Sequence, residues 1–260
     1  MPSGDPVLVR ASEDPAFILA AARDFLIARP VLNNLILSLL EARVADPQRG
    51  RYWLALRNGE VAGVAFQSPL TYPAQLTPMI SDAAVAMANA IADSGVVLPG
   101  ASGEAATAAW FAGQWTECRK SGAAPVAGFR IYELAELKEI GSVEGNLRRA
   151  SLADRDLMIR WVQAFQTEIH EPVWDVERVV DTRLTSGHLW IWEGTGPRSM
   201  AVSIKPVAGI TRIGGVYRHP KIANAATQPP ACTAFPDSNA TPVADDPLYR
   251  SRKSHVQHNL

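Results

Sequence analysis

A chain of 260 residues, with 47% hydrophobic and 20% charged residues, has the composition of a folded globular protein with room for one large domain or two ordinary ones. The formal net charge of −1 provides no basic face for nucleic acid or an anionic membrane. The most apolar segment, AAVAMANAIA at 83–92, is too short and too rich in alanine to span a bilayer, so we expect neither a nucleic-acid nor a membrane partner.

Cysteine and histidine usage predicts neither disulfides nor a metal centre. Cys118 and Cys232 lie far apart and form no disulfide framework, which favours the reducing cytoplasm. The first residues, MPSGDPVLVRASEDP, lack the basic flank and apolar run of a signal peptide. His255 and His258 are spaced as a metal pair, but they have no Cys or carboxylate partners nearby in the sequence.

The first half of the chain alternates strand and helix patterns. Leu8–Ala11 reads as a short strand, and the Ser-Glu-Asp-Pro that follows favours a helix start. The runs YWLAL and VAGVAF flank Asn58-Gly59, a dipeptide that favours the tight turn matching strand twist, so they predict a hairpin over 52–68. The spacing of apolar residues predicts the remaining elements: helices at 16–29, 33–44, 81–91 and 104–121, strands at 76–80 and 126–137, and a loop at 100–103.

Residues 138–146 have the composition of a linker, and the pattern restarts after them. Leu147-Arg-Arg-Ala-Ser151 echoes Leu8-Val-Arg-Ala-Ser12. Helices at 152–168 and 174–184 follow, and LWIWE at 189–193 then pairs with MAVSIK at 200–205 across a glycine-rich turn. We interpret this echo as two copies of one unit, the alternative being that any α/β protein repeats such elements.

The regular pattern ends after ITRIGGVY at 210–217. From Arg218 onward the sequence is rich in Pro, Ala, Asn and Thr and has no apolar period. We therefore predict a first α/β unit at 1–140, a second unit at 141–217, and an irregular, disordered tail at 218–260. The predicted fold class is α/β (α+β), with a mixed sheet flanked by helices and an incomplete second copy.

The second unit resembles the GCN5-related N-acetyltransferase (GNAT) family. The resemblance rests on strand signals that look like the first four strands of that family, at Leu147–Ser151, Leu189–Glu193, Met200–Lys205 and Arg212–Tyr217. It covers 146–217, and the first half only as a degenerate copy. The resemblance implies a tandem GNAT-like fold that transfers acetyl from acetyl-CoA, the co-substrate, to a small-molecule or peptide amine.

The phosphate-binding turn of that family is missing from its expected place. In the family the fourth strand leads into R/Q-x-x-G-x-G/A, whose main-chain N–H groups and helix N-terminus hold the pyrophosphate of acetyl-CoA. Members typically read VYTPPxxRxRGYA where this chain reads VYRHPKIANAATQPPAC. A coding sequence can be written for RHPKIANAATQPPAC that, with one base added before it and the reading frame shifted, translates as TPPKDRERGYATAC. We hypothesise that 218–260 is an out-of-frame translation, with an unrelated, evolved tail as the alternative.

The resemblance also implies site residues. Gly215, Val216 and Tyr217 match the position where main-chain groups meet the pantetheine arm and the thioester carbonyl, so they are predicted to bind the cofactor. The alternative is a buried strand end without a ligand. Since main-chain contacts barely depend on the side chain, the sequence leaves both interpretations open. Without the phosphate turn, we expect this chain to be impaired in acetyl transfer.

For the general base we predict Glu168 and Glu171, which flank His170 after the first helix of the second unit. Loops at this place line the acceptor site in the family, and a carboxylate shielded from water by Ile169 and Trp174 suits the role. The alternative is a pair of solvated charges at a helix end.

The tryptophans Trp190 and Trp192 alternate with apolar residues, and we interpret them first as core and second as a substrate wall. The alternative function, from another class, is a non-catalytic acyl-CoA-binding or protein-interaction module. The sequence does not determine an oligomeric state.

Overall fold

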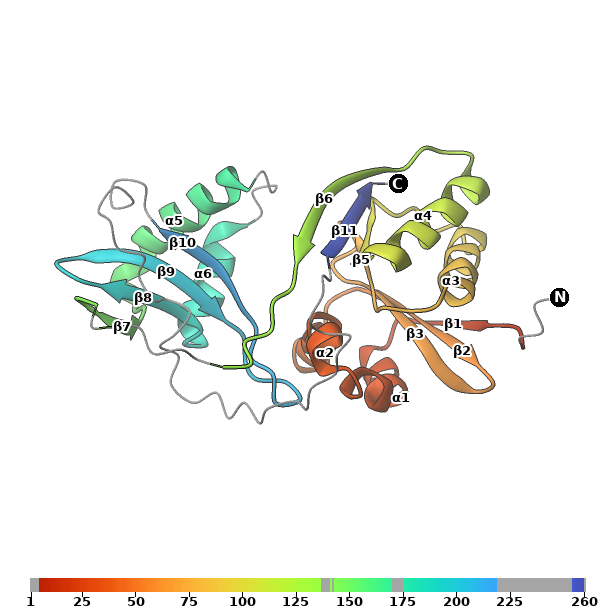
Figure 1. Cartoon of the computed structure of the whole chain (residues 1–260), viewed down its shortest axis with the longest axis horizontal. Helices are drawn as coiled ribbons and strands as arrows, with labels where there is room; N and C mark the ends of the chain where they lie inside the picture. The colour runs from red at the N-terminus through yellow and green to blue at the C-terminus, as the bar shows by residue number, and fades with distance from the viewer. Residues whose placement is uncertain (1–4, 137–140, 142, 170–174, 219–253, 260) are drawn as a thin grey trace. The chain divides into compact units, whose positions relative to one another are not determined.

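The computed structural model describes residues 5–136, 141, 143–169, 175–218 and 254–259. The chain divides into two compact units, Met1–Glu133 with Val243–Leu260 as unit 1 and Leu134–Pro242 as unit 2 (Figure 1). Both units combine strands with flanking helices, which confirms the predicted mixed α/β class. None of the helices in the described ranges combines the length and apolar character needed to cross a membrane.

Unit 1 is built on one mixed sheet with helices on it. Its elements are β1 (Leu8–Ser12), α1 (Pro15–Ile27), α2 (Pro30–Ala45), β2 (Arg51–Arg57), β3 (Glu60–Gln67), β4 (Ala74–Leu76), α3 (Ser81–Asp93), β5 (Ala101–Glu104), α4 (Ala105–Arg119), β6 (Ala124–Arg130) and β11 (Ser254–Asn259). The strand order is β1-β2-β3-β4-β5-β11-β6. Neighbouring strands are antiparallel except β4 and β5, which are parallel.

Local chemistry explains the start of this unit. Asp14 caps α1, since its carboxylate accepts a hydrogen bond of 2.8 Å from the Ala16 N–H, and Pro15 occupies the first helical position, where no N–H is needed. The hairpin of β2 and β3 turns at Asn58 and Gly59, whose φ angles of 54° and 84° are those of a type I′ turn. The hairpin predicted from this dipeptide is therefore confirmed.

The core of unit 1 lies on both faces of β2. Trp53 packs in a cluster with α3 and α4, whereas Tyr52 contacts Phe66 on the other face, with ring centroids 5.3 Å apart. Helix α3 contributes the fully buried alanines Ala83, Ala84 and Ala88, and such small side chains let a helix lie close to the sheet.

The loop predicted at 100–103 is wrong, because Ala101–Glu104 forms strand β5. Its register is set by parallel pairing with β4, where Ala101 lies opposite Ala74. Four residues of the sequence ASGE show no alternation of apolar and polar side chains, so their local pattern could not predict a strand.

Unit 2 is a four-stranded antiparallel sheet with two helices packed on one face (Figure 1). Its elements are β7 (Asn146–Arg149), the 3₁₀ turn η1 (Leu152–Asp154), α5 (Arg155–Glu168), α6 (Val176–Thr185), β8 (Leu189–Glu193), β9 (Pro197–Ser203) and β10 (Ile213–Arg218). The strand order is β10-β9-β8-β7. The same succession, strand-helix-helix and three more strands in sequential order, occurs from β1 to β4. That the two units are copies of one another stays a prediction.

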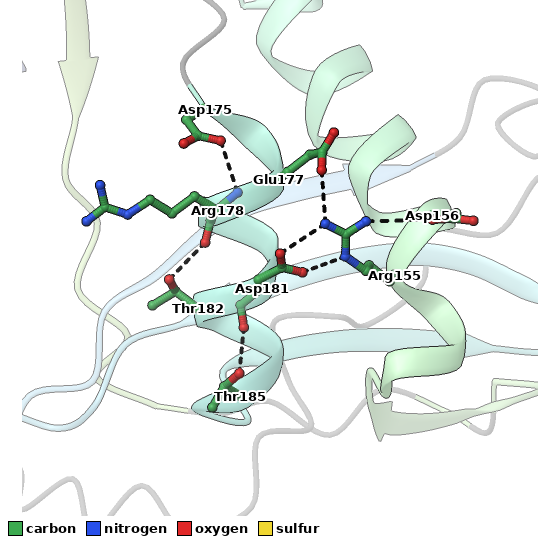
Figure 2. A network of polar contacts seen from close by, with 8 residues as sticks. All are labelled: Arg155, Asp156, Asp175, Glu177, Arg178, Asp181, Thr182 and Thr185. Atoms are coloured by element: carbon green, nitrogen blue, oxygen red, sulfur yellow. Dashed lines mark hydrogen bonds and ion pairs between the residues drawn. The ribbon is translucent and has the colours of Figure 1, made fainter.

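A polar network joins the two helices of unit 2 (Figure 2). Arg155, the first residue of α5, donates from Nε to Asp181 Oδ1 at 2.6 Å and from Nη2 to Glu177 Oε2 at 3.1 Å. Both carboxylates belong to α6, whose N-terminus is capped by Asp175. One arginine thus fixes the register of α5 against α6.

Most of the predicted tail, 219–253 and 260, lies outside the described residues. The structure places Ser254–Asn259 as β11, antiparallel to both β5 and β6. Because strand pairing uses main-chain groups, this strand is compatible with either origin of the tail.

Candidate functional site

The residues predicted to bind the cofactor lie at a β-bulge in β10. Gly214 is opposite Val202 and Tyr217 is opposite Met200, so three steps along β10 match two steps along β9. Such a bulge leaves one residue out of the hydrogen-bond ladder and turns its peptide groups away from it. The bulge therefore falls on Gly215 and Val216, two of the three residues predicted to bind the cofactor.

Glycine is required at the bulge by its backbone conformation. Gly215 has a φ of +56°, in the left-handed region, and a Cβ there would lie 3.2 Å from Val202 Cγ2. Val216, the next residue, has 43% of its surface exposed. In the described part of unit 2, β10 is the last strand on its side of the sheet, and the bulge therefore lies on an edge without a further strand.

Tyr217 anchors the strand next to the bulge. Its side chain is 6% exposed, and its ring makes edge contacts with Trp161 and Phe165 of α5, at centroid distances of 6.2 Å and 6.4 Å. The side chain belongs to the core. Only the main chain of Tyr217 is therefore available for the predicted cofactor contact.

The structure brings Glu168 close to this anchor. Burial raises the pKa of the Tyr217 hydroxyl, and the negative charge of Glu168 raises it further. Glu168, the last residue of α5, is exposed, as is Ile169 at 38%. The shielding expected from Ile169 is therefore not found, and Glu171, His170 and Trp174 lie outside the described residues.

The two tryptophans of β8 are buried, as expected for core residues. Trp190 and Trp192 are each 7% exposed, and Trp190 Nε1 donates a hydrogen bond of 2.8 Å to Ser203 Oγ. Trp192 Nε1 donates to the Glu144 carbonyl at 3.3 Å. Since both indole N–H groups have partners within the protein, the tryptophans are core residues that hold β8 to its neighbours.

Unit 1 has no phosphate-binding turn at the equivalent place, between β4 and α3. The connection is Thr77-Pro-Met-Ile80, which contains no glycine. Thr107 Oγ1 accepts a hydrogen bond of 3.1 Å from the Met79 N–H, which occupies a main-chain donor at the helix entrance. Asp82 in the first turn of α3 places a negative charge there. These residues do not fit a pyrophosphate, because a helix start that binds an anion needs free main-chain N–H groups and no carboxylate.

Sequence reasoning missed a group of basic residues in unit 2. Arg149, Arg183, His188, Lys205 and Arg212 come from five separate places in the chain and meet at one end of the sheet. No local spacing signals them, because only strand pairing brings them together. Within the ranges that the structure describes, no cluster of three or more His, Cys, Asp or Glu side chains is arranged to hold a metal ion.

Comparison with known proteins gives structural neighbours alone. No protein-family model and no curated protein matches the sequence. An acetyltransferase from the GNAT family of Colwellia psychrerythraea is similar over 82% of this chain and 78% of its own, with 9% identity and a TM-score of 0.44. A GCN5-related N-acetyltransferase from Kribbella flavida is similar over 97% of this chain and 70% of its own, with 14% identity and a TM-score of 0.38. Neither likeness bears on which reaction this chain performs, since the identities and the TM-scores are low.

Proposed function

We propose that unit 2 is the N-terminal part of an acetyl-CoA-dependent N-acetyltransferase domain, and that this chain is impaired in the reaction. The observation that supports the proposal most directly is the bulge of β10 at Gly215 and Val216, on an edge of the described sheet of unit 2 and beside the end of α5. The resemblance of the sequence over 146–217 to the GNAT family supplies the reaction class.

Acetyl transfer needs a donor for the thioester carbonyl oxygen and an acceptor for the amine proton. Acetyl-CoA supplies the acetyl group as a thioester. In the proposed reaction the Gly215 and Val216 N–H groups hold the carbonyl, since a hydrogen bond from a fixed peptide group stabilises the charge that develops on oxygen. As the amine nitrogen bonds to the carbonyl carbon and the C–S bond breaks, Glu168 takes the amine proton and the thiolate leaves.

The impairment follows from the sequence after Tyr217. The main-chain N–H groups and the helix N-terminus that hold the pyrophosphate in the family have no counterpart motif in RHPKIANAATQPPAC. Sequencing the gene across the Tyr217 codon tests the frameshift. A single-base difference from closely related genes that restores TPPKDRERGYATAC supports it, and an intact frame shared with them ends it.

Calorimetric titration with acetyl-CoA tests the function itself. We expect little or no binding by this chain and restored binding by a frame-restored version, with acetylation of a member of an amine panel by the restored protein alone. Turnover by the unrestored chain contradicts the proposed impairment. A restored protein that neither binds acetyl-CoA nor acetylates any amine contradicts the proposed reaction.

The second candidate is a non-catalytic acyl-CoA-binding or protein-interaction module. The exposure of Glu168 favours it over catalysis in this chain, because the predicted general base is not shielded from water. Binding of acetyl-CoA without turnover in the restored protein, and unchanged binding after Glu168→Gln, identifies this case.

A further inference from the structure

One end of the unit 2 sheet carries basic residues from five places in the chain, and we call it the basic end: Arg149, Arg183, His188, Lys205 and Arg212. Arg149 closes β7 and Lys205 follows β9, while His188 precedes β8 and Arg212 precedes β10. Neighbouring strands run antiparallel, so these four positions fall at the same end of the sheet. Arg183 joins them from the last turn of α6.

Main-chain hydrogen bonds connect these positions. The His188 N–H donates to the Arg183 carbonyl, the Ser203 N–H to the His188 carbonyl, and the Ile204 N–H to the Arg212 carbonyl, each at 3.0 Å. The α6–β8 turn, the end of β9 and the start of β10 are therefore fixed to one another. The arginines at these places are anchored by a rigid backbone, which lowers the entropy lost when they bind a common ligand.

Arg149 is held in place from the other side. Its guanidinium carbon lies 5.2 Å from the centroid of the Trp190 ring, and a Cβ at Gly187 would come within 3.4 Å of its Nη1. His188 Nδ1 lies 3.3 Å from Ser203 Oγ. A guanidinium stacked on an aromatic face keeps its N–H fork free for a planar or tetrahedral anion.

Most carboxylates described in unit 2 are paired away from the basic end. Figure 2 shows the acidic residues of α6 turned towards Arg155, away from Arg178. The carboxylates with a partner are Glu144 with Arg198, Asp154 and Glu193 with Arg148, Asp156, Glu177 and Asp181 with Arg155, and Asp175 at the N-cap of α6. The other two described carboxylates of unit 2 are exposed, Glu136 before β7 and Glu168 at the end of α5. Among the residues that the structure describes, Arg149, Arg183, Lys205 and Arg212 have no carboxylate ion pair.

The uncompensated charges repel one another. Burial lowers the pKa of the Arg212 guanidinium to about 10, with the Arg183 charge as a further cause. Burial also lowers the pKa of Arg183. The pKa of His188 is lowered by burial and then by the charges of Arg149 and Lys205. A bound anion relieves this repulsion, and several positive charges around one place favour an anion with more than one negative charge.

We propose that the basic end of unit 2 binds a phosphate-bearing anion, held by Arg183 and Arg212 with Arg149 at its side. This is a second site. Arg212 precedes the first residue of β10, whereas Glu168 and Tyr217 lie near the last. The site does not depend on the proposed acetyl transfer, and phosphate is favoured over a carboxylate because arginine forks match its oxygens and its higher charge.

Calorimetric titration of the full chain with inorganic pyrophosphate, at constant ionic strength, tests the proposal. We expect Arg183→Gln and Arg212→Gln each to weaken binding by about 10–100-fold, as the loss of a charged hydrogen bond does. Arg178→Gln is the matched control, since it removes the same charge from the same helix at an exposed position. Inorganic phosphate in parallel shows whether one phosphoryl group suffices. No heat of binding at millimolar pyrophosphate overturns the proposal, as does equal weakening by Arg178→Gln.

Chemical modification of the unaltered protein tests the same site without any substitution, so it remains available if a variant fails to fold. Phenylglyoxal reacts with accessible arginines, and peptide mapping locates the products. We expect pyrophosphate to protect Arg183 and Arg212 and to leave Arg178 reactive. Modification unaffected by pyrophosphate contradicts the site. Acetyl-CoA titrated into the same variants distinguishes the two proposals. Because acetyl-CoA also carries a pyrophosphate, binding that is lost in Arg183→Gln belongs to the basic end, whereas binding that survives in this variant belongs to the bulge of β10.

Discussion

The bulge of β10 makes a sharp prediction about two neighbouring glycines. Gly215 has a φ of +56°, and a Cβ there would lie 3.2 Å from Val202 Cγ2, whereas a Cβ at Gly214 would meet nothing within 4 Å. The left-handed conformation costs a residue with a side chain about 1–2 kcal/mol. The close contact also requires Val202 to move by a few tenths of an ångström within a packed region. We therefore expect Gly215→Ala to lower the free energy of unfolding of unit 2 by about 1–2 kcal/mol.

Gly214→Ala is the matched control, because it adds the same methyl group to the same strand at an exposed position. It should leave the free energy of unfolding unchanged or raise it by up to about 1 kcal/mol, because alanine reduces the conformational entropy of the unfolded chain. Scanning calorimetry measures both variants, and hydrogen exchange of α5 peptides assigns the transition that belongs to unit 2. A loss of 1 kcal/mol corresponds to about 4–8 °C for a domain of this size. If Gly215→Ala unfolds at the same temperature as the unaltered protein, or if both variants lose the same stability, the left-handed conformation assigned to Gly215 is wrong.

Three further predictions concern unit 2. Tyr217→Ala should cost about 3–5 kcal/mol in unfolding free energy and Tyr217→Phe much less, as judged by urea denaturation, because the ring packs against Trp161. Asp154→Asn should cost about 1–2 kcal/mol, since Asp154 pairs with Arg148 and closes the capping box with Ser151. Arg148 and Ser151 hold the pKa of Asp154 well below its usual range, and the stability it contributes is present above the unfolded pKa of 3.8 and lost below it. The pKa of His188 is lowered, so the unfolded chain takes up a proton at this residue before the folded chain does, and the free energy of unfolding falls as the pH drops through 6.5. His188→Gln should reduce that fall in thermal melts between about pH 7.5 and 5. An unchanged pH profile contradicts the assignment.

Features set by neighbouring residues were accessible from the sequence. Asn58-Gly59 predicts a hairpin because both residues tolerate positive φ, and the structure has φ of 54° and 84° there. In LWIWE at 189–193 the tryptophans alternate with Leu189 and Ile191, so both faces of the strand carry apolar side chains and are predicted to be buried. Both tryptophans are buried in the structure. The mixed α/β class follows from such local signals added along the chain.

The site was only partly accessible from the sequence. The resemblance pointed to Gly215 and Val216, but the bulge itself depends on how β10 pairs with β9. Glu168 was expected to be shielded by Ile169, and both are exposed, because helix α5 directs its apolar side towards β10 and ends there. A sequence pattern gives the side of a helix that is buried, and it does not give the exposure of the residues after its last turn.

The sequence by itself determined the helices and strands that have a clear side-chain period, and the hairpins, because these depend on that period and on the backbone preferences of a few residues. The tertiary structure alone decided that ASGE is the strand β5 and that the last turns of α5 lie against Tyr217. It also gathered Arg149, Arg183 and Arg212 at one end of a sheet. The physical reason is the same in each case: these neighbours are far apart in the chain, and their distance is set by strand pairing and helix packing, which no local pattern encodes.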